Sequence, residues 1–281
     1  NHTVVIPMNY EGIWTLNNYF IVYDTHKKGL FDKKGGEILP LIYSHIQQSH
    51  TRGSKIIITQ RDSVGPANQT LFGIANAKGE FIATELKSIQ YIYDPLKLYN
   101  PSIQYGGSYL AIQNKSELWG ILNEFKEELV VPFSYNQVQQ KYSYDDQAFF
   151  ILKQGHKYGI VNQFYETIIP FEYDALNFNF LVNHRNEGLH TKAIIAKKDG
   201  KFGLINFKNE IVCPFEYEAL EKIDFTDHYK AKKDGYYLLI DQKNKVLNPG
   251  PFDEISQFED GTALTFNNGM MRTINKDGLI T

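Results

Sequence analysis

The eight histidines are the first candidates for chemistry, because imidazole binds metals and transfers protons near neutral pH. They are His2, His26, His45, His50, His156, His184, His190 and His228. None lies in an HExxH motif or forms a Cys/His pair at the spacing of zinc ligands. His184 and His190 share one predicted loop with Arg185 and Glu187; we interpret them as solvated, with a bound metal ion as the alternative. The sequence therefore predicts no metal site and no cofactor.

Acidic residues offer two further kinds of chemistry, calcium binding and acid–base catalysis. The segments Asp32–Glu37 and Asn275–Gly278 superficially suggest calcium loops, but they lack the alternating oxygen ligands and the distal acid of an EF-hand. Asp145 and Asp146 are adjacent, and neighbours in sequence do not by themselves form an acid–base pair. A carboxylate pair assembled from distant parts of the chain stays open as an alternative.

No serine or cysteine has the setting of a catalytic nucleophile. The chain contains no GxSxG motif. Its single cysteine, Cys213, falls at a repeated position that holds Leu39, Val131 and Ile169 elsewhere, so we expect an inert core thiol. The sequence predicts no catalytic residue, and we interpret the protein as a non-enzyme.

Composition narrows the class of partner. The 281 residues carry a net charge of −3, with acidic and basic residues interspersed. Because no basic stripe is present to contact phosphates, we predict no nucleic-acid partner. No apolar run approaches the ~20 residues of a membrane-spanning helix. The chain begins at Asn1 rather than Met, which indicates a processed product with any leader or anchor out of view.

A repeat of about forty residues organises the whole chain. Its anchor is usually glycine, followed two residues later by an apolar residue and three residues later by Asn or Asp. The anchor positions are Gly29, Gly73, Gly120, Gly159, Gly203, Leu238 and Arg272. The Asn or Asp positions are Asp32, Asn76, Asn123, Asn162, Asn206, Asp241 and Asn275. The chain therefore contains seven copies of one unit.

Each unit contains two predicted tight turns. An Asn or Asp side chain bonds back to the backbone in a hairpin turn, and Gly or Asn three residues later tolerates the positive φ that the turn exit needs. Those later residues are Gly35, Gly79, Asn209, Asn244 and Gly278. A second turn precedes the anchor in KDGK at 198–201, KDGY at 233–236 and NNGM at 267–270. The unit therefore predicts four short antiparallel strands, which begin near Ala193, Phe202, Ile211 and Tyr217 in the fifth copy.

The sequence predicts an all-β fold, a seven-bladed β-propeller-like ring that forms a single domain over residues 1–281. Val4–Tyr10 aligns with Ile211–Tyr217, so the chain starts halfway through a unit, and it ends with the first half of one. We therefore expect the N- and C-terminal half-units to close the ring, which would remove exposed edge strands. An open β-hairpin solenoid is the alternative.

The unit resembles the WG-repeat family of bacterial proteins, which carries an aromatic–Gly pair, an Asn or Asp turn and a proline–aromatic–x–Tyr segment. The best copies are Leu118–Phe125, Lys157–Phe164 and Lys201–Lys208, and Trp119 with Gly120 is the single literal Trp-Gly pair. The resemblance covers nearly the whole chain and implies a structural or interaction module, often associated with the cell envelope. It therefore favours the bacterial periplasm or cell surface, with the cytoplasm as the alternative.

Insertions are expected to gather on one rim, because successive turns of an antiparallel meander alternate between its two ends. The expanded segments fall between the last strand of one predicted unit and the first of the next, at 49–55, 94–107, 141–147 and 177–192. Two interpretations of segment 60–70 stay open: an insertion on this rim, or an elongated hairpin turn on the opposite rim.

The insertions contain aromatic and arginine residues, which frequently anchor interfaces. We name as binding candidates Tyr99, Tyr105, Tyr142, Tyr144, Phe178, Phe180 and Arg185. Packing within the loops is the alternative interpretation. The sequence thus favours a non-catalytic binding scaffold whose partner is a protein or an extracellular glycan. The alternatives are a carbohydrate-active enzyme with a central-channel site and a passive structural module of a larger protein.

Overall fold

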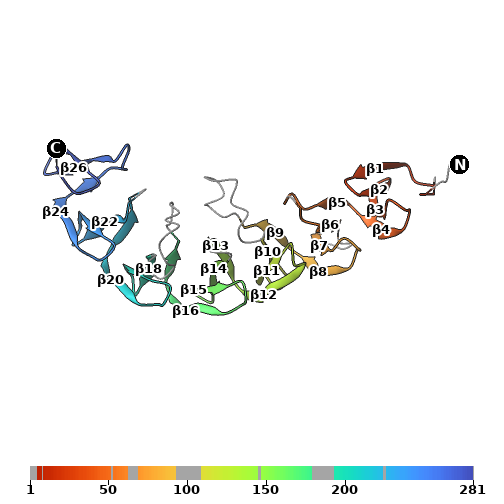
Figure 1. The fold of residues 1–281 in the computed structure, drawn as a ribbon, viewed down its shortest axis with the longest axis horizontal. Coiled ribbons are helices and arrows are strands. Elements are labelled where there is room, and N and C mark those ends of the chain that lie inside the picture. The colour runs from red at the N-terminus through yellow and green to blue at the C-terminus, as the bar shows by residue number, and fades with distance from the viewer. Residues whose placement is uncertain are drawn as a thin grey trace. The chain divides into compact units, whose positions relative to one another are not determined.

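The computed structural model describes residues 5–7, 9–51, 53–62, 69–92, 109–144, 147–178, 193–223 and 226–280. The regular secondary structure of these residues consists of β-strands. They include no helix that is long and apolar enough to cross a membrane. The strands form seven antiparallel sheets that follow one another along the chain (Figure 1). The predicted all-β fold of repeated, propeller-like sheets is therefore confirmed.

The chain divides into two compact units, and the first comprises Asn1–Ile92 and Gly107–Asn136. It contains three four-stranded sheets. Their strands are β1 (Gly12–Leu16), β2 (Tyr19–Asp24), β3 (Lys27–Asp32) and β4 (Glu37–Tyr43); β5 (His45–Gln48), β6 (Ile57–Asp62), β7 (Thr70–Ala75) and β8 (Phe81–Leu86); and β9 (Ser88–Tyr91), β10 (Tyr109–Gln113), β11 (Trp119–Asn123) and β12 (Glu128–Tyr135).

The second unit includes Gln137–Thr281 and contains the other four sheets. Their strands are β13 (Gln137–Tyr144), β14 (Gln147–Gln154), β15 (Lys157–Asn162) and β16 (Thr167–Tyr173); β17 (Ala175–Asn177), β18 (Ile194–Lys198), β19 (Lys201–Ile205) and β20 (Ile211–Tyr217); β21 (Ala219–Lys222), β22 (His228–Lys233), β23 (Tyr236–Asp241) and β24 (Val246–Phe252); and β25 (Glu254–Ile255), β26 (Thr262–Asn267) and β27 (Met270–Asn275).

All seven predicted Asn or Asp turns form, between the third and fourth strands of the first six sheets and after β27. In the β19–β20 turn, Oδ1 of Asn206 accepts the backbone N–H groups of Lys208 at 2.9 Å and Glu210 at 3.0 Å. Matching bonds are made by Asp32, Asn76, Asn162, Asp241 and Asn275. Oδ1 of Asn123 instead accepts from the N–H groups of Phe125 and Lys126. Positive φ occurs at the predicted residues Gly35, Gly79, Asn209, Asn244 and Gly278. We call the end of each sheet that holds this turn the Asx end.

The second predicted turn also forms, between the second and third strands. Its two central residues both have positive φ, which is the geometry of a type I′ hairpin. The pairs are Asp199 with Gly200, Asp234 with Gly235 and Asn268 with Gly269. Because this turn joins the opposite ends of the same strands, it lies away from the Asx end.

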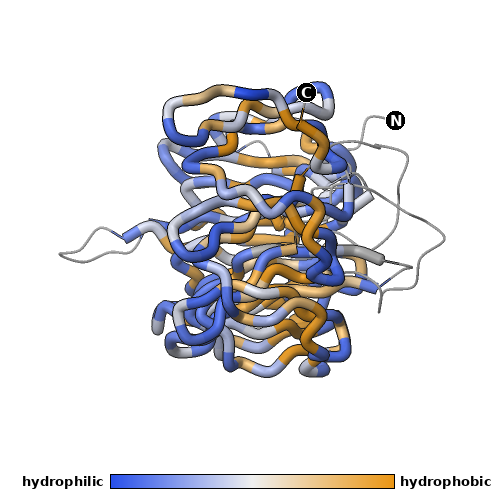
Figure 2. The backbone as a smooth tube through the Cα atoms, turned by 90° about the vertical axis from the view of Figure 1, so that its left-hand side faces the viewer, coloured by the Kyte–Doolittle hydropathy of each residue, from blue (hydrophilic) through white to orange (hydrophobic). Residues whose placement is uncertain are grey.

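Apolar side chains fill the space between consecutive sheets within each unit. Ile21 and Leu30 of the first sheet pack with Ile57 of the second. In the other unit, Leu204 of the β17–β20 sheet packs with Tyr229 of the next sheet. Along the chain, hydrophobic stretches coincide with strands and hydrophilic ones with turns (Figure 2). Each sheet is therefore stabilised largely by burial against its neighbours.

The anchor glycine allows the fourth strand to approach the third. A Cβ atom on Gly203 would lie 2.7 Å from the carbonyl oxygen of Cys213. In the β21–β24 sheet Leu238 takes the anchor position, and Gly250 with φ +69° stands on the facing strand, where a Cβ would lie 2.5 Å from the carbonyl oxygen of Tyr237. One of the two facing strands therefore supplies a glycine in each of these sheets.

The predicted unit boundary was wrong. The strand after Tyr217 is β21, which pairs with β22 and is the first strand of a sheet instead of the fourth. Only Glu218 separates β20 from β21, and its N–H donates to the carbonyl oxygen of Lys232 in the next sheet. The expanded segments therefore connect the first and second strands of one sheet, at its Asx end. Segment 60–70 spans the β6–β7 connection, at the opposite end.

Among the described residues, no strand of the N-terminal segment pairs with the last sheet, so the predicted fourth strand from the N-terminus is not found there. The last sheet has three strands, and on the free side of β27 Ile274 makes one bridge with Ile280 of the same C-terminal segment. Arg272 occupies the anchor position of β27, where other sheets have a glycine on the third strand or on the strand facing it. The N-terminal segment contains no glycine for that facing position, so the close contact of third and fourth strands seen in other sheets is not available here. Ile6 instead clusters with Val22 of the first sheet.

Candidate functional site

In two sheets, the residue directly after the turn Asn contacts the expanded segment of the preceding sheet. It is Glu124 in the β11–β12 turn and Phe207 in the β19–β20 turn. Because side-chain hydrogen bonds hold the turn backbone, the backbone of each of these two residues is held in place. The two belong to different units and form two separate loop bases.

Glu124 fixes the β5–β6 loop. Its carboxylate is 1% exposed and accepts hydrogen bonds from the hydroxyl groups of Ser49, of Thr51 at 2.7 Å and of Ser54 at 3.3 Å. Ser49 and Ser54 are themselves buried. A buried carboxylate is costly unless such donors compensate its lost hydration. The loop is therefore tied at three points to the neighbouring sheet.

The tied loop presents aromatic and imidazole side chains. The exposed His50 lies with its ring 5.9 Å from that of Tyr91, and its backbone N–H donates to the Tyr91 hydroxyl at 3.1 Å. Phe125 follows Glu124 and is 53% exposed. A Cβ atom on Gly53 would lie 3.7 Å from the Phe125 ring, so loop and ring are in contact range. We call these four residues, His50, Gly53, Tyr91 and Phe125, the His50–Phe125 surface.

In the second unit the loop base is aromatic. The ring of Phe207 is buried and stacks on Phe178, with 6.0 Å between centroids and 7° between planes. Tyr142 and Phe149 complete the cluster, at 6.1 and 5.1 Å from the Phe207 centroid. Phe178 is the first residue after β17, so the β17–β18 insertion begins from this packed base.

The structure places the seven predicted binding residues in three groups. Tyr142 and Phe178 are each 5% exposed, so these two rings pack the scaffold instead of offering a surface. The two rings lie 5.5 Å apart, and Phe207 packs against both of them. Tyr144 ends strand β13. The remaining predicted residues lie outside the described part of the chain: Tyr99, Tyr105, Phe180 and Arg185, together with His184, His190, Asp145 and Asp146.

Sequence reasoning missed Glu124 and the serines that bind it. Two signals were present: an acidic residue directly after the turn asparagine Asn123, and a loop at 49–55 with three hydroxyl side chains. Neither signal shows in one sequence that the two segments meet. Their contact depends on the packing of one sheet on the next.

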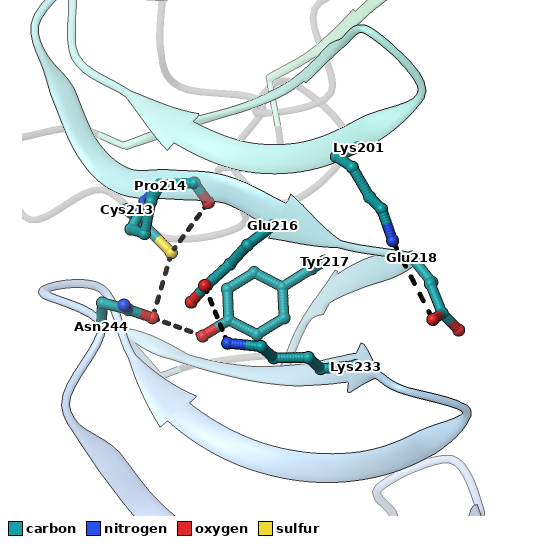
Figure 3. A network of polar contacts seen from close by, with 8 residues as sticks. All are labelled: Lys201, Cys213, Pro214, Glu216, Tyr217, Glu218, Lys233 and Asn244. Atoms are coloured by element: carbon teal, nitrogen blue, oxygen red, sulfur yellow. Dashed lines mark hydrogen bonds and ion pairs between the residues drawn. The ribbon is translucent and has the colours of Figure 1, made fainter.

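A polar contact joins the fourth strand of one sheet to the Asn or Asp turn of the next (Figure 3). The Tyr217 hydroxyl at the end of β20 donates to Oδ1 of Asn244 at 2.5 Å, and Lys233 pairs with Glu216 at 2.8 Å. The hydrogen bond from Lys233 lowers the pKa of the Glu216 carboxyl, because it stabilises the charged form. The Tyr217 hydroxyl and the Glu216 carboxylate thus each have a partner in the next sheet.

The same contact recurs one sheet earlier. The Tyr173 hydroxyl donates to Asn209 at 2.6 Å, and Lys198 pairs with Glu172 at 3.1 Å. Burial, with the adjacent Glu172 charge, raises the pKa of Tyr173 to about 12. The repetition indicates a structural role in holding sheets together.

Cys213 lies beside this contact and has the character of a core thiol. Its Sγ atom is 3.3 Å from Oδ1 of Asn244, and burial raises the pKa of the thiol to about 12. The thiol is therefore protonated at neutral pH. Within the described ranges, no three His, Cys, Asp or Glu side chains are grouped so that they could hold a metal ion.

No protein-family model and no curated protein matches the chain. Among solved structures it is similar to Hsv2 of Kluyveromyces lactis, with 10% identity, a TM-score of 0.37, and coverage of 79% of this chain and 70% of that one. BamB from Moraxella catarrhalis shares 10% identity at a TM-score of 0.32, with 96% and 83% covered. BBS1N, solved in complex with ARL6DN, shares 12% identity at 0.33, with 98% and 92% covered. The fold assignment rests on the strand pairings.

Proposed function

We propose that the protein is a non-catalytic binding scaffold whose sheets hold variable loops for contact with another protein. The observation that carries this proposal is the buried Glu124, which fixes a surface loop while His50 and Phe125 stay exposed beside it. Loops held by a rigid framework commonly carry binding residues. Exposed aromatic side chains of this kind are frequent interface anchors. An extracellular glycan is the second class of partner, since aromatic rings also contact sugars.

The WG-repeat resemblance remains part of this proposal. The aromatic–Gly anchor, the Asn or Asp turn and the proline-containing fourth strand recur along the chain. Together they support an interaction module of the bacterial envelope.

The experiment compares binding by wild-type protein and two variants. Immobilised protein is incubated with envelope extract of the source organism, and a glycan panel is probed in parallel. Any partner found is purified for affinity measurement. Phe125→Ser removes the exposed ring, and Glu124→Ala frees the β5–β6 loop. We expect each change to weaken binding at least tenfold, the effect of losing an interface anchor of roughly 1.4 kcal/mol or more.

Lys33→Ala is the matched control, because Lys33 holds the position after the turn Asp32 in the first sheet and is exposed. Thermal melting checks that each variant is folded. Equal binding by Phe125→Ser and wild type would exclude the His50–Phe125 surface. Turnover of a glycan would favour the carbohydrate-active enzyme, and absence of any binding would favour the passive structural module.

A further inference from the structure

Three sheets of the second unit cover an aromatic ring with their own lysine. In each, a lysine of the second strand lies opposite an aromatic residue of the third strand, with Nζ above the ring. The pairs are Lys153 with Tyr158 at 5.4 Å, Lys197 with Phe202 at 5.1 Å and Lys232 with Tyr237 at 5.2 Å to the ring centroid. The aromatic face at this position of the repeat therefore receives an ammonium group.

The β5–β8 sheet has the aromatic ring with a glutamine in place of the lysine. Glutamine also faces Trp119 in the β9–β12 sheet, but there Nε2 of Gln113 donates to the carbonyl oxygen of Glu117 at 3.1 Å. His45, Gln60 and Phe72 lie opposite one another on β5, β6 and β7, so Gln60 takes the place of the lysine. Glutamine is neutral and shorter. In the part of the chain that the structure describes, no cation lies over Phe72 and the Gln60 side-chain amide makes no hydrogen bond. The ring is thus left uncovered.

A cavity of about 220 Å³ is present where the lysine is missing. It is lined by His45, Gln47, Ile58, Thr59, Gln60 and Phe72. The lining combines an apolar wall, Ile58 and Phe72, with the amide oxygens of Gln47 and Gln60. The Gln47 oxygen lies 3.3 Å from Nε2 of His45 and keeps a second lone pair for another donor. It contains no Lys or Arg to repel a cation. A lysine-sized group with one positive charge matches both the chemistry and the space.

We propose that this cavity binds an alkylammonium group, supplied by a lysine side chain of a partner protein or by a free amine. The carbon stem of the ligand packs against Phe72 and Ile58, and the ammonium group lies over the Phe72 ring and donates to the amide oxygens of Gln47 and Gln60. None of the residues that line the cavity belongs to the His50–Phe125 surface. The inference therefore goes beyond the proposed function and uses a different site.

The test titrates the full chain with n-butylammonium and follows binding through NMR chemical shifts of the protein. Primary alkylamines are protonated at pH 7.5, as lysine is. We expect saturable binding of n-butylammonium at one site and at least tenfold weaker binding of the neutral n-butanol. A short peptide with one lysine, compared with its norleucine counterpart, distinguishes a partner side chain from a free amine. Glucose tests the competing sugar ligand.

The decisive variant is Gln60→Lys, which supplies the covering lysine found in three sheets of the second unit. It is expected to fold and to weaken n-butylammonium binding at least tenfold. Gln242→Lys adds the same charge in the β21–β24 sheet and is expected to bind as wild type does. Phe72→Leu keeps an apolar wall without the ring and is expected to bind roughly three- to tenfold more weakly.

Lys197→Gln gives an independent answer should Gln60→Lys fail to fold. It uncovers Phe202 in the β17–β20 sheet and is expected to raise the number of n-butylammonium sites from one to two. The proposal is overturned if n-butylammonium does not bind wild type saturably, if n-butanol binds equally well, or if glucose binds and the amine does not. It is also overturned if folded Gln60→Lys binds n-butylammonium as tightly as wild type does, or if Lys197→Gln has the same number of n-butylammonium sites as wild type.

Discussion

At the residue scale, Asn244 shows how one side chain couples two sheets. Its Oδ1 atom accepts the Tyr217 hydroxyl at 2.5 Å and lies 3.3 Å from the Cys213 sulfur, both in the preceding sheet. The Tyr217 ring is buried, so its hydroxyl depends on this acceptor in the folded state.

Tyr217→Phe is expected to lower the free energy of unfolding by about 1 kcal/mol, because the hydrogen bond is lost while ring burial is kept. Urea unfolding measures the change. Tyr158→Phe is the control, since its exposed hydroxyl makes a longer 3.3 Å bond to Gln137; we expect a loss below about 0.5 kcal/mol there. Equal losses in the two variants would contradict a special contribution of the Tyr217–Asn244 bond.

Cys213 is expected to resist thiol reagents in the folded protein. Burial raises its pKa from 9.0 to about 12, so the reactive thiolate is scarce at pH 8. Reaction with dithiobis(nitrobenzoate) at pH 8 should proceed at the rate of unfolding and become fast in concentrated urea. Rapid labelling of protein whose melting curve shows it to be folded would contradict this description of the site.

At the element scale, the Asn or Asp turn is the most regular part of the repeat. Asn206 combines two backbone N–H bonds to Oδ1 with a 2.7 Å bond from Nδ2 to the Glu210 carboxylate. The position is aspartate in two other sheets, at Asp32 and Asp241. The acceptor oxygen is therefore the shared requirement of this turn.

Asn206→Ala is expected to lower the free energy of unfolding by about 1–2 kcal/mol, because the turn backbone loses its acceptor. Asn206→Asp in a Glu210→Gln background keeps that acceptor without bringing two carboxylates together, and is expected to cost less than about 0.5 kcal/mol at pH 7 relative to Glu210→Gln alone. Chemical denaturation of both variants measures the difference. A loss in the Asp variant as large as that in the Ala variant would show that the amide nitrogen, and not the acceptor, stabilises the turn.

At the scale of the molecule, sheets are joined by apolar packing and by charge pairs at their boundaries. At these boundaries, in the described residues, hydrogen bonds from lysines hold the pKa of three carboxyl groups below the ordinary values of 3.8 for Asp and 4.5 for Glu. The pairs are Glu172 with Lys198, Asp174 with Lys157 and Glu216 with Lys233. All of them lie in the second unit, so their effect on stability concerns that unit.

We expect the protein to lose stability in acid. A carboxyl group with a lower pKa in the folded state contributes stability that is present above its unfolded pKa and is lost as pH falls through the folded pKa. Stability should therefore be steady from pH 7 to about 5 and decline below that. Urea unfolding across this range measures the slope. Combined Lys157→Met, Lys198→Met and Lys233→Met changes should flatten it, and an unchanged slope would exclude these pairs as the cause.

The insertions could be located from the sequence, but the residues that matter in them could not. Alternating turns correctly predicted that the expanded segments share one end of the sheets. The predicted rings Tyr142 and Phe178 are packing residues, because Phe207 of another turn contacts both. Glu124 was missed because its partners are remote: Ser49 lies 75 residues away in the chain.

By itself, the sequence determined the seven repeats, their strands and both kinds of turn. These features depend on contacts within a few residues, such as Asn206 with Glu210, and on the positive φ of Asp199 and Gly200. Only the tertiary structure decided which sheet the strand after Tyr217 joins and that, among the described residues, no fourth strand pairs with β27. Those outcomes depend on burial and close approach between segments far apart in the chain, which local preferences do not specify.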